Sequence, residues 1–289
     1  MSVAEAPAVE EKPETPARRW PRRVPRTIGR LGWRKARCLF GLTTGRVGTT
    51  TLAKALQLSP EIEAFHEPPP RDERTYRDAY REVYADPDAV RRLFVECRAG
   101  AIGAFRRRGK VYAECNNFQF AAPVVADLLP RSVFLFLHRD PAEYVRSGMR
   151  RGWYGGHPWD SRRITPRPDD PAAAEWDAWG PFEKIAWFWT ACNRQFLDTV
   201  NGLPPERSVT IPFAELVAGS GEALLPVFDK LGVDRPPASE LNAVYADRHN
   251  AQRKGDFAHP SKWTGDQRET LRRIAGPVMD ALGYGEAAS

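Results

Sequence analysis

A short turn of glycine, arginine and threonine residues has the composition of an anion-binding loop. It reads Gly45-Arg46-Val47-Gly48-Thr49-Thr50-Thr51, and apolar residues at helical spacing follow it. Glycines let a backbone approach a ligand closely, and the first N–H groups of a helix attract negative charge. Arg46 adds a permanently charged planar donor, and the threonines add hydroxyl donors. The turn therefore predicts a site for a sulfate or phosphate group.

The cation of this turn does not stand where a standard nucleoside-triphosphate loop has it. That loop has lysine directly after its last glycine, whereas Thr49 follows Gly48 here and Arg46 precedes Gly48 by two positions. The turn therefore favours a sulfate or phosphate site that differs from a standard nucleoside-triphosphate loop. A P-loop kinase or NTPase is the alternative. Another alternative is a Gly/Thr turn that begins a helix and binds no ligand.

A second group of candidate anion ligands follows the continuous apolar run 132–137. His138-Arg139-Asp140-Pro141 comes directly after this run, and Ser147 lies eight residues beyond Arg139. Asp followed by Pro is typical of a helix start, which places Ser147 on that helix. An arginine can hold a phosphate through two parallel hydrogen bonds. A third basic segment, Arg253-Lys254-Gly255, precedes His259-Pro260.

These motifs resemble those of the sulfotransferases that use 3′-phosphoadenosine 5′-phosphosulfate (PAPS). The family loop has Lys or Arg, any residue, Gly and two Ser/Thr, which Arg46-Val47-Gly48-Thr49-Thr50 matches. The family also has Arg-(Asn/Asp)-Pro with a Ser eight residues after the Arg, and both contact the 3′-phosphate. A late Arg-Lys-Gly or Lys-Gly…His-Pro loop closes over the nucleotide, although its spacing differs here.

The resemblance implies that the chain moves a sulfuryl group from PAPS to an acceptor hydroxyl. It implies that the nucleotide binds to residues 46–51, Arg139, Ser147 and 253–255. Many cytosolic members have a tryptophan that stacks on adenine where this chain has Thr51. Adenine must therefore bind to another surface here. The carbohydrate or tyrosyl type, Golgi or bacterial, is the nearer match.

The candidates for the general base are two carboxylates at predicted strand ends. In the Golgi-type sulfotransferases the base is a glutamate about twenty residues after the loop cation, and Glu67 stands at that distance from Arg46. Glu114 stands where the cytosolic members have histidine. We favour Glu67 as the base and Glu114 as a positioning residue, with His66 as a further candidate.

Short apolar runs alternate with helical patterns over residues 37–285. The runs expected to form strands are 38–42, 62–65, 110–113, 132–137 and 208–211. This alternation predicts an α/β, three-layer P-loop-like fold with a central parallel sheet of about five strands flanked by helices. Such sheets bind ligands at the carboxyl ends of their strands. Near the end of the chain, Thr264 and Gln267 predict a capping box.

The net charge of +6 belongs to the beginning of the chain. Residues 1–37 contain ten basic and four acidic residues, so the remainder is neutral. We interpret residues 1–36 as a disordered basic leader before a sulfotransferase domain of 37–285. A leader of this kind could hold a polyanion, and a non-catalytic polyanion-binding protein is a second alternative. We expect no specific nucleic-acid binding.

The spacing of the cysteines and histidines indicates a reducing compartment and no bound metal. The four cysteines and five histidines show neither zinc spacing nor a disulfide framework. No stretch approaches the roughly 20 apolar residues that span a bilayer, and we expect a cytoplasmic protein.

A long segment between the predicted fourth and fifth strands, 153–180, resists regular structure and is rich in aromatic residues. Loops of this length are usually functional or mobile. Aromatic faces suit sugar rings, and arginines suit an anionic acceptor, so the segment favours a carbohydrate or polysaccharide. Packing in the core is the alternative for its tryptophans. The arginines in and near it are Arg151, Arg162, Arg163 and Arg167.

Overall fold

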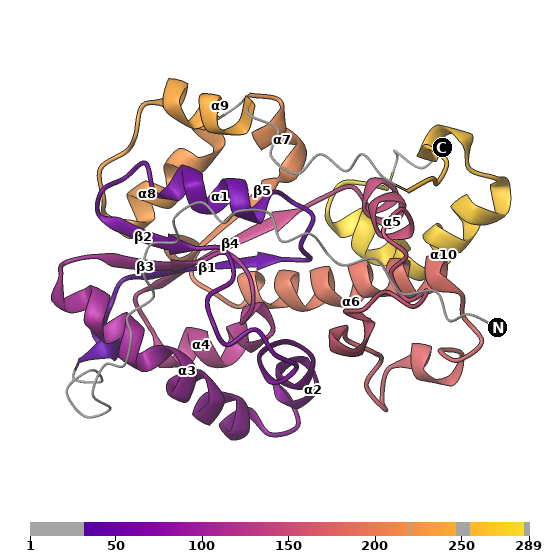
Figure 1. The fold of residues 1–289 in the computed structure, drawn as a ribbon, viewed down its shortest axis with the longest axis horizontal. Helices are drawn as coiled ribbons and strands as arrows, with labels where there is room; N and C mark the ends of the chain where they lie inside the picture. The colour runs from indigo at the N-terminus through magenta and orange to yellow at the C-terminus, as the bar shows by residue number, and fades with distance from the viewer. Residues whose placement is uncertain (1–31, 220, 247–254, 286–289) are drawn as a thin grey trace, which may run out of the picture.

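The computed structural model describes residues 32–219, 221–246 and 255–285. A five-stranded sheet in the order β2-β3-β1-β4-β5 forms the centre of the molecule (Figure 1). Every neighbouring pair of strands is parallel. The strands are β1 (Cys38–Thr43), β2 (Ile62–Phe65), β3 (Val111–Glu114), β4 (Ser132–His138) and β5 (Ser208–Pro212). The predicted α/β fold with about five parallel strands is confirmed.

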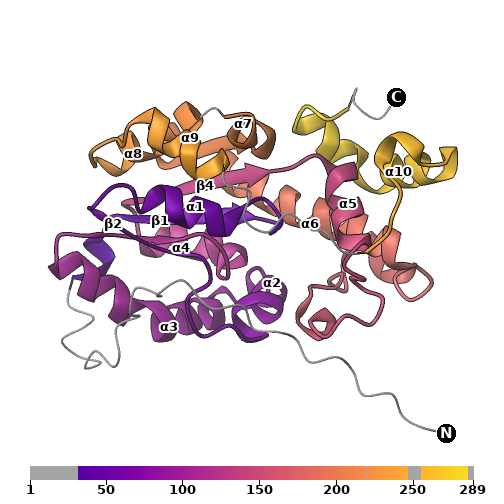
Figure 2. The same ribbon diagram turned by 45° about the horizontal axis from the view of Figure 1, so that its top comes forward.

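Helices cover both faces of the sheet, as Figures 1 and 2 show from two directions. One face is covered by α1 (Thr49–Leu56), α7 (Phe213–Val217), α8 (Leu225–Leu231) and α9 (Ala238–Ala246). The other is covered by α2 (Ala79–Glu82), α3 (Pro87–Arg107), α4 (Ala122–Leu128) and α6 (Pro181–Asn201). Beyond the end of β4 lie α5 (Pro141–Met149) and α10 (Gly265–Ala281).

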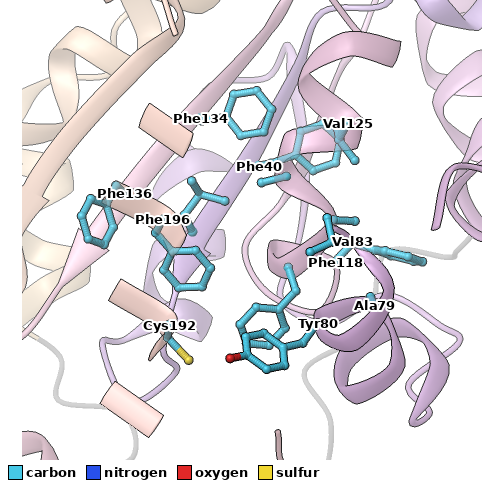
Figure 3. Close-up of a cluster of buried hydrophobic side chains, with 14 of the residues drawn as sticks. Phe40, Ala79, Tyr80, Val83, Phe118, Val125, Phe134, Phe136, Cys192 and Phe196 are labelled. Atoms are coloured by element: carbon cyan, nitrogen blue, oxygen red, sulfur yellow. The ribbon is translucent and has the colours of Figure 1, made fainter. Parts of the chain in front are cut away.

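The core is divided by the sheet because successive side chains of a strand point to opposite faces. In β1, Leu39 packs with the helices of one face, whereas Phe40 packs with those of the other. Figure 3 shows Phe40 together with Phe134 and Phe136 of β4, opposite Phe196 of α6. Both faces are apolar, which explains why β4 is an uninterrupted hydrophobic run.

Two local features bear on the sequence analysis. Residues 32–36, assigned there to the leader, include a 3₁₀ turn at Trp33–Lys35, and the indole of Trp33 is buried against α3. The rest of the predicted leader lies outside the described residues. The predicted capping box is confirmed, because the Thr264 hydroxyl accepts from the Gln267 N–H and Gln267 Oε1 accepts from the Thr264 N–H. None of the described helices is both long and apolar enough to cross a membrane.

Candidate active site

A cavity of about 840 Å³ lies at the carboxyl ends of the strands. It is lined by residues from the segments that follow all five strands, including several between Arg146 and Arg163 of α5 and the loop after it. The sheet thus brings together motifs that are separated by up to a hundred residues in the sequence, as predicted for ligand sites of this fold class.

The turn after β1 has an unusual backbone that opens the helix N-terminus to the cavity. Gly45, Arg46 and Gly48 have φ values of 73°, 59° and 69°. The left-handed conformation costs a non-glycine residue roughly 1–2 kcal/mol, so the fold stabilises Arg46 in a strained position. A Cβ at Gly48 would lie 2.9 Å from the ring of Phe213. No side chain among the described residues caps helix α1, which leaves its first N–H groups for an anion.

Most of the predicted loop faces the cavity, with one exception. Arg46, Gly48 and Thr49–Thr51 line it. Val47 does not, because its side chain is fully buried in the core against α1. The contribution of Val47 to an anion site is therefore restricted to its backbone.

Three predicted anion ligands meet at the loop. Arg139 Nη1 donates to the Arg46 carbonyl at 3.0 Å, and Arg46 Nε lies 3.5 Å from Ser147 Oγ. Burial, together with the neighbouring charges of Arg151 and Arg139, lowers the pKa of Arg46 to about 10. Burial also lowers the pKa of Arg139, against the attraction of Glu143. These cations repel one another in a partly buried site, and a bound anion would stabilise them.

Glu143 is a residue of the site that the sequence analysis missed. Its carboxylate lies 3.4 Å from Arg139 Nη2, 3.8 Å from Arg146 Nη1 and 3.4 Å from His259 Nε2. The signal available in the sequence was its spacing of four from Arg139, in the first turn of the helix predicted to begin at Asp140. Glu143 orients Arg139 and ties the segment around His259 to α5.

The third basic motif is described only at its last residue. Arg150 Nε donates to the Gly255 carbonyl at 2.9 Å. Gly255 has a φ of 82°, and a Cβ there would lie 2.0 Å from the Arg150 carbonyl oxygen. Only glycine fits this approach, which docks the segment beside the cavity. Arg253 and Lys254 lie outside the described residues.

Glu67 follows β2 and lines the same cavity. Asn116 Nδ2 donates to its Oε1 at 3.0 Å, and His66 Nε2 lies 3.6 Å from the same oxygen. No described residue hydrogen-bonds Oε2, so one oxygen is oriented while the other is available to accept a proton. Burial lowers the pKa of His66 despite the nearby Glu67, which favours a neutral imidazole.

Glu114 does not line the cavity. It is 2% exposed, and Arg98 donates to both of its oxygens at 2.7 and 3.0 Å, while the Tyr112 hydroxyl donates at 2.6 Å. Arg98 also donates to the carbonyls of Pro68 and Pro69 at 3.1 and 2.8 Å. Glu114 thus holds Arg98, and Arg98 holds the chain directly after Glu67.

The long segment 153–180 is divided between the cavity and the core. Trp153, His157, Trp159, Arg162 and Arg163 line the cavity. Other members pack away from it: Trp176 lies edge-on against Trp187 with ring centroids 5.0 Å apart, and Arg167 donates to the Tyr80 carbonyl and Gln195. Nothing in the sequence distinguishes these two sets, because both are aromatic and basic. Within the described part of the chain, no three His, Cys, Asp or Glu residues are grouped as metal ligands.

No protein-family model matches the chain, and no curated protein does. Solved structures with a similar fold include a sulfotransferase from Alicyclobacillus acidocaldarius, which is 19% identical with a TM-score of 0.44 over 86% of this chain and 94% of that one. Mouse SULT7A1 complexed with PAP is 14% identical, with a TM-score of 0.47 over 88% of both chains. Sulfotransferase STF1 from Mycobacterium tuberculosis is 12% identical, with a TM-score of 0.49 over 84% of this chain and 76% of that one. All three structures are of sulfotransferases.

Proposed function

We propose that this chain transfers a sulfuryl group from PAPS to an acceptor hydroxyl. The observation that carries the proposal is the direct contact of the two predicted anion sites: Arg139 donates to the Arg46 carbonyl at 3.0 Å. One nucleotide with a phosphosulfate at its 5′ end and a phosphate at its 3′ end needs two cationic groups in a single cavity.

The donor would lie across the carboxyl ends of β1 and β4. Residues 45–51 and the first N–H groups of α1 would bind the phosphosulfate. Arg139 and Ser147 would bind the 3′-phosphate, and the segment ending at Gly255, with Arg253 and Lys254, would cover it. Phe213 lines the cavity beside Gly48, and the Arg139 guanidinium lies 5.7 Å from the centre of its ring. The Phe213 ring is therefore the proposed surface for adenine in place of the missing tryptophan.

The chemistry assigned to the protein is proton transfer and charge stabilisation. Glu67 Oε2 would take the proton of the acceptor hydroxyl as that oxygen forms its bond to sulfur on the side opposite the nucleotide. The bond between sulfur and the bridging phosphate oxygen breaks in the same displacement, and its electron pair remains with the nucleotide. Arg46 and the N–H groups of residues 48–50 would stabilise that oxygen, by roughly 3–4 kcal/mol for a well-placed donor.

The acceptor side of the cavity favours a carbohydrate or polysaccharide. Trp153 and Trp159 line it together with His157 and the arginines of the same segment. Indole faces pack against sugar rings, and the 50% exposure of Trp159 leaves one such face accessible. We place the reaction in the cytoplasm, since all four cysteines are free thiols in the structure.

The proposal is tested by incubating the protein with sulfur-35-labelled PAPS, EDTA and a panel of polysaccharides, phenols and tyrosyl peptides. We expect label to be transferred to a saccharide hydroxyl, with a gain of about 80 daltons per transfer, and the chelator to have no effect. Transfer to none of these acceptors, with PAPS left intact, would argue against an enzyme and for the polyanion-binding alternative.

A further inference from the structure

Two arginines beside Glu67 have no acidic partner among the described residues. Arg71 Nε donates to the Glu67 carbonyl, and Arg162 Nη1 donates to the Arg71 carbonyl at 3.1 Å. Both side chains line the cavity. Backbone carbonyls fix one nitrogen of each guanidinium, so the remaining N–H groups are oriented donors close to the proposed base.

Arg162 is held in place by the loop around it. Its guanidinium lies 4.4 Å from the centre of the Trp159 ring, an arrangement that stabilises the cation at an accessible indole. Asp160 fixes this loop by accepting from the N–H groups of Tyr154, Gly156 and His157 at 2.8–3.1 Å. The geometry of the Arg162–Trp159 pair thus exists before any ligand arrives, which lowers the entropic cost of binding.

The charges on this side of the cavity do not balance. Arg163 is paired with Asp160 at 2.9 Å, and Asp72 is paired with Arg74 at 2.8 Å. Arg151 has a buried Nε without a hydrogen-bond partner in the described structure. Arg71 and Arg162 have no carboxylate partner in the described part of the chain. Among the described residues that line the cavity, Glu67 is the only carboxylate that is not paired with an arginine. An anionic ligand group would correct this excess.

We propose that the acceptor carries a carboxylate or sulfate group beside its reacting hydroxyl, and that Arg162 and Arg71 bind this group while the hydroxyl lies at Glu67. This inference rests on the proposed sulfotransferase function and narrows it to anionic saccharides. Guanidinium groups match both carboxylate and sulfate geometry. The hydrogen-bond chain from Arg162 through Arg71 to the Glu67 carbonyl sets the spacing between the anion and the base.

The test compares three forms of one polymer. They are a polysaccharide of alternating hexuronate and N-acetylhexosamine, the same polysaccharide with its carboxyl groups reduced to alcohols, and the reduced polymer carrying sulfate esters. Binding is measured by calorimetry with 3′-phosphoadenosine 5′-phosphate (PAP) present, and transfer is measured with labelled PAPS. The variants are Arg162→Gln and, as a control of equal charge loss, Arg81→Gln, because Arg81 is exposed and outside the cavity.

We expect the wild-type protein to prefer one or both charged polymers over the reduced one by about tenfold or more, since a hydrogen bond to a charged group has an effect of this size. Arg162→Gln should remove most of this preference while the Kd of PAP stays unchanged, and Arg81→Gln should retain it. The charged polymer that is preferred identifies the group as carboxylate or sulfate.

Three results would overturn the inference: equal use of charged and reduced polymers, binding of none of them, or a preference that stays intact in Arg162→Gln. If PAP still binds, these results leave the proposed donor site in place. Absence of PAP binding would remove the sulfotransferase function itself, and the inference with it.

Discussion

We expect Glu67→Gln to lower kcat by about 10²–10⁴-fold, the range of general base catalysis. The amide keeps the size of the side chain and an oxygen that Asn116 can orient, but it cannot take the proton of an acceptor hydroxyl. The Kd of PAP should stay within about twofold, because the proposed nucleotide ligands lie on other loops. Single-turnover transfer from labelled PAPS and calorimetry with PAP measure the two quantities.

Glu82→Gln is the matched control for this variant. Glu82 lies on α2, is exposed and does not line the cavity, so its turnover should equal that of the wild-type protein. A Glu67→Gln enzyme with near wild-type kcat would remove Glu67 from the role of base. Glu114 is a poor replacement, since Arg98 and Tyr112 occupy its carboxylate.

The second large effect is expected on the affinity for the donor. Arg139→Ala should raise the Kd of PAP by about 10–100-fold, because hydrogen bonds to a charged group contribute roughly 1.5–3 kcal/mol. The affinity for adenosine 5′-phosphosulfate, which lacks the 3′-phosphate, should change little. Arg131→Ala, which removes an exposed arginine far from the cavity, should change neither value.

The comparison of the two nucleotides separates a direct role from a structural one. Arg139 also contacts the loop through the Arg46 carbonyl. If this contact were its main role, Arg139→Ala would weaken the binding of both nucleotides alike. Equal losses for both would contradict the assignment of the 3′-phosphate to Arg139.

The fold and the chemical core of the site could be predicted from the sequence because their signals are local. The apolar runs at 38–42 and 132–137 form parallel strands, and the motifs that follow them are brought to one edge of the sheet by the topology alone. The cavity therefore contains Arg46, Glu67 and Arg139 together.

What could not be predicted depends on contacts between distant segments. Arg98 is part of an ordinary helical pattern, and its pairing with Glu114 and with the carbonyls after Glu67 appears only when α3 packs on the sheet. Phe213 follows the last strand as one apolar residue among many, yet its ring reaches Gly48. In the segment 153–180, only packing decides that Trp159 is accessible while Trp176 contacts the core.

The binding of two nucleotides by calorimetry tests the central claim most directly. PAP and ATP with magnesium are titrated into the same protein under the same salt concentration. We predict that PAP binds at least tenfold more tightly, because Arg139 and Ser147 offer a site for a 3′-phosphate that ATP lacks. If ATP binds as tightly as PAP or more so, the cavity belongs to a kinase or NTPase and the sulfotransferase account is contradicted.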